Sequence, residues 1–94
     1  MSRNRSSPRF EFDERKSRLN KLKHGIDFME AQGLWLDPRL ARAPADTLLE
    51  ERFVVMGRMN GKQWSAVVTM RGDAVRLISV RRSRVKEVEA YESQ

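Results

Sequence analysis

Arginines in the second half of the chain are the residues whose type and spacing best support chemistry. Four of them lie in or beside runs with strand character: Arg71, Arg76, Arg81 and Arg82. Planar guanidinium groups bind phosphate oxygens bidentately and stabilise the negative charge that develops during phosphoryl chemistry. Arg76 falls in mid-strand between two apolar residues, where an unpaired cation costs free energy. These arginines are therefore candidates for binding a phosphodiester, and the alternative is ordinary solvated charge at strand ends.

If the chain is an enzyme that cleaves RNA, these cations alone are not sufficient. Attack by the 2′-hydroxyl of the RNA on the neighbouring phosphate also needs protein groups that accept and donate protons. His24 is the only imidazole, Glu51 opens a predicted strand, and Tyr91 falls in the last helix. Each has a structural alternative. A histidine before Gly25 caps a helix end, Glu51 and Arg52 form a surface ion pair, and Tyr91 anchors its helix.

Metal and nucleotide motifs are missing from the sequence. There is one histidine and no cysteine, and the acids are not grouped as a carboxylate motif. No Walker loop, glycine-rich phosphate fingerprint or HExxH motif occurs. We therefore expect no cofactor and no metal ion. The longest apolar runs are too short to span a bilayer, and no signal peptide is recognisable, so we expect a cytoplasmic protein without membrane contact.

The 94 residues carry a net charge of +6 that is unevenly distributed. Residues 58–86 hold eight Lys or Arg against the single acid Asp73, whereas residues 24–57 and the last eight residues are acidic. A basic segment built on defined elements is typical of a surface that binds a polyanion such as nucleic acid. Scattered surface charge on a basic protein is the alternative.

Capping signals predict two helices in the first half of the chain. A short strand at 10–12 leads to Asp13, which caps a helix running to Lys23 and closed by Gly25. Asp27 with Glu30 three residues later is a capping box, and the second helix that it begins is predicted to end at 37–38. The stretch 38–50 is predicted to be a loop with an extended piece at 40–43.

Turn signals predict three strands and a last helix. Asn60-Gly61 is the strongest hairpin signal, and Arg71-Gly72-Asp73 is a second tight turn. They separate strands at 51–59, 62–70 and 74–82, and Ser83 is predicted to cap a helix at 84–92. The predicted fold class is α+β, with two N-terminal helices packed on an antiparallel sheet of three to four strands and a short C-terminal helix.

Alternation along the strands assigns one face of the sheet to the core and leaves one open. In the strand 62–70 the even-numbered residues face the helices. The strand 74–82 has aliphatic residues on both faces. Placing Ser79 inward puts Val80 and Arg82 outward beside Arg76. The open face is then both basic and apolar, which suits a groove that binds RNA phosphates, a protein partner, or each in turn.

The chain resembles the BrnT toxin family across residues 10–91. The N-terminal part of the match is Phe10-x-Phe12-Asp13-x-x-Lys16-x-x-x-Asn20-x-x-Lys23-His24-Gly25-Ile26-x-Phe28-x-Glu30-Ala31. The later part comprises Asp37-Pro38, Glu51-Arg52-Phe53, Gly57, Thr69-x-Arg71, Arg76-Leu77-Ile78-Ser79-Val80-Arg81-Arg82, Glu87 and Tyr91. The sequence departs from the family pattern at Phe12, Val80, Ser83-Arg84 and Val88, the last of which replaces a common arginine.

The resemblance implies a RelE-like fold and a metal-independent endoribonuclease toxin of a type II toxin–antitoxin system, which inhibits translation by cleaving RNA. It also implies a BrnA-type ribbon-helix-helix antitoxin as partner, through which alone the pair binds operator DNA. Predicted catalytic residues are Arg76, Arg81, Glu51, His24 and Tyr91. Predicted RNA-binding residues are Arg71, Arg52, Arg58, Arg82 and Lys23. Residues 1–9 are predicted to be a flexible basic arm and residues 10–94 one toxin domain. A non-catalytic module that binds RNA or antitoxin as a corepressor scaffold is the alternative.

Overall fold

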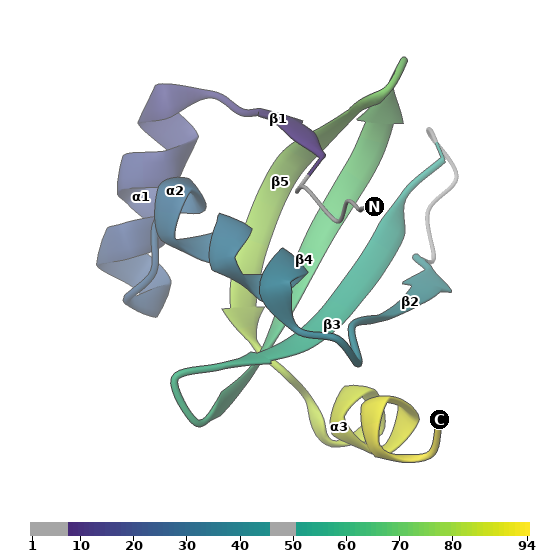
Figure 1. Cartoon of the computed structure of the whole chain (residues 1–94). Coiled ribbons are helices and arrows are strands. Elements are labelled where there is room, and N and C mark those ends of the chain that lie inside the picture. The colour runs from purple at the N-terminus through teal and green to yellow at the C-terminus, as the bar shows by residue number, and fades with distance from the viewer. Residues whose placement is uncertain (1–7, 46–50) are drawn as a thin grey trace.

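A five-stranded sheet carries the chain's helical segments, as the computed structural model shows for residues 8–45 and 51–94. In chain order the elements are β1 (Arg9–Glu11), α1 (Glu14–His24), α2 (Phe28–Ala31), the 3₁₀ helix η1 (Gln32–Leu36), β2 (Ala41–Pro44), β3 (Phe53–Met59), β4 (Lys62–Arg71), β5 (Ala74–Arg82) and α3 (Val85–Glu92). The segments α1, α2 and η1 lie along one face of the sheet, and α3 lies at one end of β3 and β5 (Figure 1).

The caps of the first two helices confirm the local prediction. The Asp13 carboxylate accepts hydrogen bonds from the main-chain N–H groups of Arg15 and Lys16, and Gly25 ends α1 with a φ of 80°. The predicted capping box is present, because Asp27 and Glu30 each accept the other's main-chain N–H. These bonds satisfy donors that the first helical turn leaves without an intrahelical partner.

The second helix is shorter than predicted. α2 is a single turn, and the chain continues as the 3₁₀ helix η1 instead of one α-helix to residue 37. Close packing accompanies the tighter winding. A side chain at Gly33 would come within 2.9 Å of the Met59 sulfur, so η1 lies directly against the end of β3.

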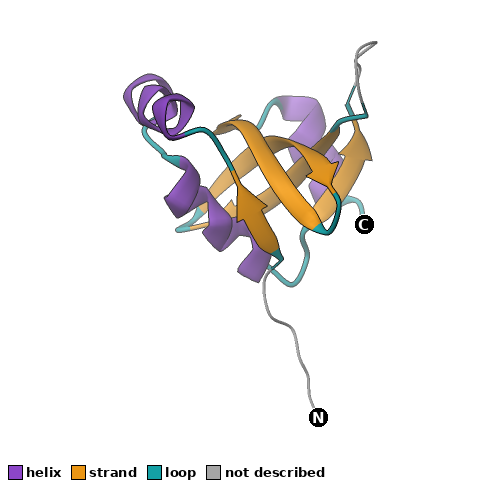
Figure 2. Cartoon of the chain, turned by 90° about the horizontal axis from the view of Figure 1, so that it is seen from above, coloured by secondary structure: helices purple, strands orange, loops and turns teal. Residues whose placement is uncertain are grey.

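The sheet has more strands than predicted and is mixed. The order is β1-β5-β4-β3-β2 (Figure 1), with β1 parallel to β5 and the remaining pairs antiparallel. Figure 2 shows the strands from above, with helices beside the sheet. The prediction of three to four antiparallel strands was therefore wrong at both edges. The extended piece expected at 40–43 is the edge strand β2, paired with β3. Residues 46–50 of the predicted loop lie outside the described residues, as do residues 1–7 of the predicted basic arm.

Both predicted turns are confirmed. Asn60 and Gly61 have φ values of 54° and 75°, which match the two-residue turn of a twisted hairpin, and Gly72 has a φ of 62°. The cap of α3 was predicted one residue too early. The N-cap is Arg84, because the Ser83 main-chain N–H bonds to the Gln63 oxygen and extends the sheet pairing.

The apolar core fills the space between the sheet and the N-terminal helical segments. Phe28, Ala31 and Leu34 come from α2 and η1 and are completely buried. Their partners across the layer are Val55, Trp64, Ala66, Val68, Val75, Leu77 and Val80, with Ile26 joining from the segment between α1 and α2. The face of the sheet opposite α1, α2 and η1 is called the open face below.

Candidate active site on the open face of the sheet

A β-bulge in β5 decides which side chains reach the open face. Val67 pairs with Ser79, but its neighbour Val68 pairs with Leu77, so Ile78 is an extra residue on β5. An extra residue shifts the alternation of all later side chains by one position. Val80 is therefore fully buried in the core. The predicted inward Ser79 and outward Val80 were both wrong.

The same shift separates two neighbouring arginines. Arg81 pairs with Ser65 and lies on the open face, where both contact the same carboxylate. Arg82 pairs with Trp64, and its guanidinium carbon lies 5.6 Å from the centre of that indole ring on the helical face. The predicted placement of Arg82 on the open face was wrong, because the strict alternation on which it rested fails at Ile78.

Glu87 of α3 holds the Arg81 guanidinium in a bidentate ion pair. The Nη1–Oε1 and Nη2–Oε2 distances are 2.7 and 2.8 Å, and the two side chains are 19% and 17% exposed. Ser65 Oγ and the Arg84 main-chain N–H also donate to Glu87 Oε1, at 2.9 and 2.7 Å. Two parallel bonds fix the plane of a guanidinium, so Arg81 is held in one orientation.

These contacts keep Glu87 ionised. The hydrogen bonds from Arg81 lower its pKa to about 2, against the opposing effect of burial, and the Arg84 N–H and Ser65 hydroxyl lower the pKa further. The hydrogen bonds to Glu87 also raise the pKa of Arg81. Because Glu87 stays charged near neutral pH, its role is to orient Arg81 and not to accept a proton.

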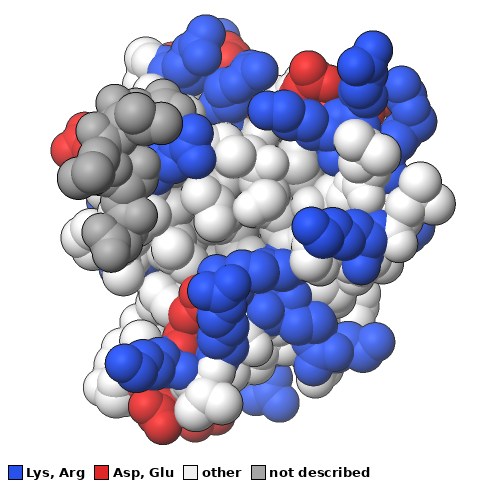
Figure 3. All heavy atoms as spheres, turned by 180° about the vertical axis from the view of Figure 1, so that it is seen from behind, with Lys and Arg blue, Asp and Glu red and all other residues white. Residues whose placement is uncertain are grey.

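A hollow of about 400 Å³ opens beside this ion pair. Its walls come from the end of β2, from β3 and β4, from the end of β5 and from the start of α3. Its lining residues are Pro44, Ala45, Arg52, Val54, Val67, Arg81, Arg84 and Glu87. Among the lining residues that the structure describes, three arginines stand against one glutamate, so this lining carries an excess of positive charge. Figure 3 shows this side of the molecule, with Lys and Arg side chains around a pale, hollowed centre. We call this feature the arginine hollow.

Further cations lie along the open face from the arginine hollow. Arg76 pairs with Thr69 across the sheet, and its Nη1 lies 3.7 Å from the Glu11 carboxylate of β1. Arg71 is exposed at the end of β4. Thr69 donates its hydroxyl to the main-chain oxygen of Glu51 at 2.7 Å, which holds the start of β3 against this face. The open face thus offers positive charge at both ends.

Five other predicted site residues do not line the arginine hollow. One of them is Glu51, although it directly precedes the lining residue Arg52. His24 and Lys23 end α1 in the helical layer. Arg58 is exposed on β3, where its main-chain N–H donates to Asp37. The Tyr91 ring is buried and its hydroxyl donates to the same Asp37 carboxylate at 2.7 Å, which joins α3 to the end of η1.

Asp37 organises this second contact. Burial opposes its ionisation, but hydrogen bonds from the Arg39 N–H, the Tyr91 hydroxyl and the Arg58 N–H outweigh burial and lower the pKa of Asp37. The bond to Asp37 raises the pKa of Tyr91. Tyr91 therefore keeps its proton and holds α3 in place, which keeps Glu87 beside Arg81.

Sequence reasoning missed Glu87 and Arg84 as site residues. Their spacing carried a usable signal, since a glutamate three residues after a helix N-cap reaches back to the cap's main-chain N–H. The cap was predicted at Ser83 instead, and the Ser83 hydroxyl lies 2.8 Å from Ser65 Oγ.

The family comparison covers the residues that build this site. A family model described as the ribonuclease toxin BrnT of type II toxin–antitoxin systems matches residues 12–87. The chain belongs to the BrnT family. The match includes every lining residue of the arginine hollow and ends at Glu87, before Tyr91.

Other comparisons add little to this family assignment. The search among curated proteins found no match. None of the helices in the two described ranges is long and apolar enough to cross a membrane. Members of a type II system act with an antitoxin, so an antitoxin partner follows from the family.

Proposed function

We propose that this BrnT-family chain is a metal-independent endoribonuclease whose active site is the arginine hollow, and that it inhibits translation by cleaving RNA. The observation that carries the proposal is the oriented Arg81, fixed by Glu87 at the edge of a hollow that also contains Arg52 and Arg84. Preorganised cations aimed at a developing negative charge supply the largest single contribution to many enzymatic rate enhancements.

The proposed reaction is an intramolecular transesterification. The 2′-oxygen of the RNA attacks the neighbouring phosphorus and loses its proton, while the bond from phosphorus to the 5′-oxygen breaks and that oxygen gains a proton. The products are a 2′,3′-cyclic phosphate and a 5′-hydroxyl end. Arg81, Arg52 and Arg84 stabilise the extra negative charge on the pentacoordinate phosphate.

In this proposal the Glu51 carboxylate accepts the proton of the 2′-hydroxyl, and a water molecule donates the proton that the leaving 5′-oxygen gains. Glu51 precedes Arg52 in the chain, and its main-chain oxygen is held on the open face by Thr69. Glu87 is unsuited to the task, because a carboxylate with a pKa of about 2 is a weak base near neutral pH. Arg76 and Arg71 bind neighbouring phosphates of the same RNA strand farther along the face.

The proposed metal independence follows from the available side chains. The sequence has one histidine and no cysteine. Within residues 8–45 and 51–94, no three acidic or histidine side chains form a group that would hold a metal ion. Cleavage that persists in EDTA is the expected result.

The antitoxin in this proposal is a BrnA-type protein with a ribbon-helix-helix domain. That domain supplies operator recognition, and this chain reaches DNA only through it. A pair of proteins from one operon would thus both neutralise the ribonuclease and repress its expression.

One observation favours the non-catalytic alternative. Among the described residues, the lining of the arginine hollow contains no histidine, and its one carboxylate is held ionised by Arg81. A binding module that docks RNA or antitoxin as a corepressor scaffold needs only the cations and the apolar floor formed by Val54 and Val67.

Cleavage of bulk RNA by the purified chain in EDTA separates the two functions. Removing one preorganised donor costs about 100-fold or more in rate, so Arg81→Ala is expected to lower cleavage by at least that factor. Arg82→Ala is the matched control, since Arg82 is the next residue of β5 and lies on the opposite face. Its cleavage rate is expected to stay within about threefold of the original.

Three results would count against the proposal. Equal losses in both variants would reject the assignment of the site to the open face. Cleavage abolished by EDTA would reject metal independence. RNA that is bound but left intact by well-folded protein, with binding lost in Arg81→Ala, would establish the binding module.

A further inference from the structure

The helix α1 buries polar residues against the sheet and leaves both of its leucines exposed among charged residues. Its buried residues are the polar Ser17 and Asn20, whereas Leu19 and Leu22 are 56% and 84% exposed. An amphipathic helix normally buries its apolar stripe against the sheet. Here hydrogen bonds take the place of apolar packing on the inner side, and the leucines are left for another contact.

Hydrogen bonds explain how the polar inner side is tolerated. The Asn20 amide donates to the main-chain oxygens of Ile26 and Val80 and accepts from the Val80 N–H, at 2.8 to 3.1 Å. Ser17 Oγ accepts from the Phe28 N–H at 2.9 Å. These bonds bind α1 to the edge of β5 and to α2 without the help of its leucines.

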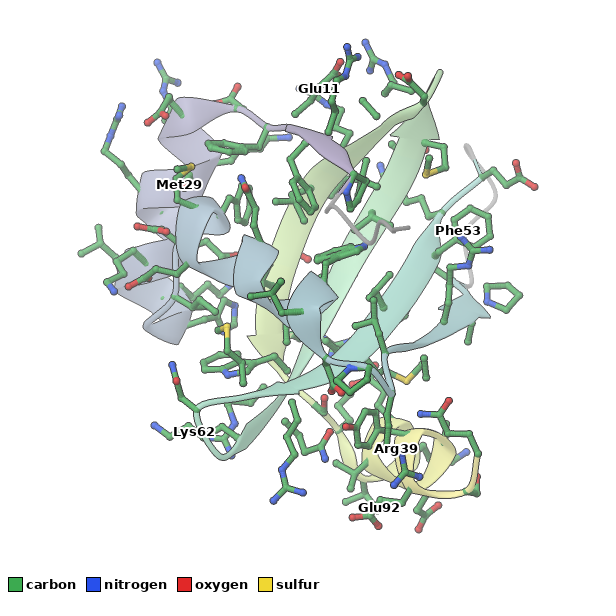
Figure 4. All side chains as sticks on the ribbon, viewed as in Figure 1. Glu11, Met29, Arg39, Phe53, Lys62 and Glu92 are labelled. Carbon is green, nitrogen blue, oxygen red and sulfur yellow. The ribbon has the colours of Figure 1, made fainter. Side chains whose placement is uncertain are left out.

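Leu22 lines a depression between α1 and α2, and Leu19 lies about one helical turn before it on α1. Met29 of α2 is 65% exposed and lines this depression together with Leu22, and its volume is about 350 Å³. Figure 4 labels Met29 beside α1, in the helical layer that covers the face opposite the arginine hollow. Clustered exposed apolar side chains rimmed by polar residues are typical of a protein-binding surface. We call this the α1–α2 face.

The charge around the α1–α2 face selects the kind of partner. Five basic residues of α1 stand against three acids around this face, and the bases remain in excess although Lys21 pairs with Glu30 at 2.8 Å and Arg18 with Glu14 at 3.6 Å. The bases are Arg15, Lys16, Arg18, Lys21 and Lys23, and the acids are Glu14, Asp27 and Glu30. A second copy of the chain would bring two such basic helices together, and like charges across an interface oppose association. An acidic partner gains from the same charges.

We propose that the α1–α2 face binds an acidic amphipathic helix of the antitoxin, with apolar side chains set over Leu19, Leu22 and Met29. The inference rests on the proposed toxin–antitoxin pairing, and it places a docking contact on the side of the sheet opposite the RNA site. The helix contributes Asp or Glu side chains toward the lysines and arginines of α1. Antitoxin held here remains bound to the toxin independently of what occupies the arginine hollow.

Calorimetric titration of the purified chain with the antitoxin of its operon tests this docking contact in the absence of RNA. Loss of one buried leucine contact and the introduction of a repelling charge are expected to raise the Kd of Leu22→Asp by roughly 10- to 100-fold. The matched control is Leu36→Asp, because Leu36 is 75% exposed at the end of η1 and is not part of the depression. Its Kd is expected to change less than about threefold.

Ribonuclease activity gives a second readout. Leu22→Asp is expected to cleave RNA as the original chain does, yet to need a correspondingly higher antitoxin concentration for neutralisation. An unchanged Kd, or equal losses in Leu22→Asp and Leu36→Asp, would overturn the inference. So would light scattering that shows a dimer of this chain dissociated by Leu22→Asp, because the occupant would then be a second copy. If the chain does not cleave RNA, the comparison of Kd values for the antitoxin can still be made. The proposed ribonuclease activity and the proposed docking contact can therefore be refuted independently.

Discussion

Replacing Glu87 by Gln tests whether the Arg81–Glu87 ion pair holds the site together. The substitution keeps the size of the side chain and removes its charge. Four donated hydrogen bonds reach this carboxylate, two from Arg81 and one each from Ser65 and the Arg84 N–H. A neutral amide has one acceptor oxygen, so it cannot accept both bonds of the guanidinium fork.

The pKa of Glu87 gives the size and the sign of the effect. A carboxyl whose pKa falls from 4.5 in the unfolded chain to about 2 in the folded one stabilises the fold. The contribution is on the order of 3 kcal/mol, at about 1.4 kcal/mol for each pH unit. Because the pKa is lowered on folding, this stability is complete above the unfolded value and is lost as the pH falls toward about 2.

Chemical denaturation at a series of pH values from neutral to acid measures this contribution. At neutral pH, Glu87→Gln is expected to lower the free energy of unfolding by roughly 2 to 3 kcal/mol. The difference from the original chain is expected to shrink below pH 4.5 and to vanish near pH 2. Glu89→Gln is the control, since Glu89 is an exposed residue of the same helix, and a change within about 0.5 kcal/mol is expected.

Two outcomes would refute this reasoning. If the original chain and Glu87→Gln lose stability in parallel as the pH falls, Glu87 does not carry the acid sensitivity. If Glu87→Gln and Glu89→Gln are equally stable at neutral pH, the ion pair contributes no net stability. An RNA cleavage rate that stays unchanged in stable Glu87→Gln would further show that the orientation of Arg81 does not matter for the reaction.

Three more substitutions probe how the fold supports the site. Asn20→Ala removes three buried hydrogen bonds to main-chain atoms and is expected to lower the free energy of unfolding by about 2 to 4 kcal/mol. The control Leu19→Ala, at an exposed neighbour, is expected to lower it by less than about 0.5 kcal/mol, and equal effects would refute the role of the Asn20 amide. Tyr91→Phe removes the hydrogen bond to Asp37 and is expected to lower the free energy of unfolding by about 1 kcal/mol and to speed hydrogen exchange of the α3 amides. Unaltered exchange would contradict the role of Tyr91 as an anchor of α3. An alanine side chain at position 25 would meet no atom within 4 Å, but the backbone there has a φ of 80°. Gly25→Ala is therefore expected to lower the free energy of unfolding by about 1 kcal/mol through backbone strain alone, measured by thermal or chemical unfolding. An equally stable variant would show that α1 ends in another conformation.

Local rules explain the parts of the fold that the sequence predicted well. The caps at Asp13 and Asp27 and the turn at Asn60-Gly61 each depend on residues within three or four positions of one another. Such bonds form whenever the local backbone is compatible with them, whatever lies across the core. The helix starts and the strand boundaries of the second half followed from these signals.

The same local signals failed where packing against distant segments decides the conformation. η1 winds as a 3₁₀ helix against Met59, and β1 pairs in parallel with a strand more than sixty residues away. Ser83 was a plausible helix cap by sequence, but its pairing with Gln63 extends the sheet instead. None of these partners lies within reach of a local pattern.

For the site, the sequence determined the chemistry and the tertiary structure decided the geometry. The sequence by itself indicated phosphate binding, because it has many arginines, one histidine and no cysteine. Arg81 and Arg52 were among the predicted site residues. Only the folded chain shows that the bulge at Ile78 turns Arg81 to one face and Arg82 to the other. Side-chain alternation is a local rule with a period of two, and a single extra residue, accommodated by the pairing of two whole strands, reverses it.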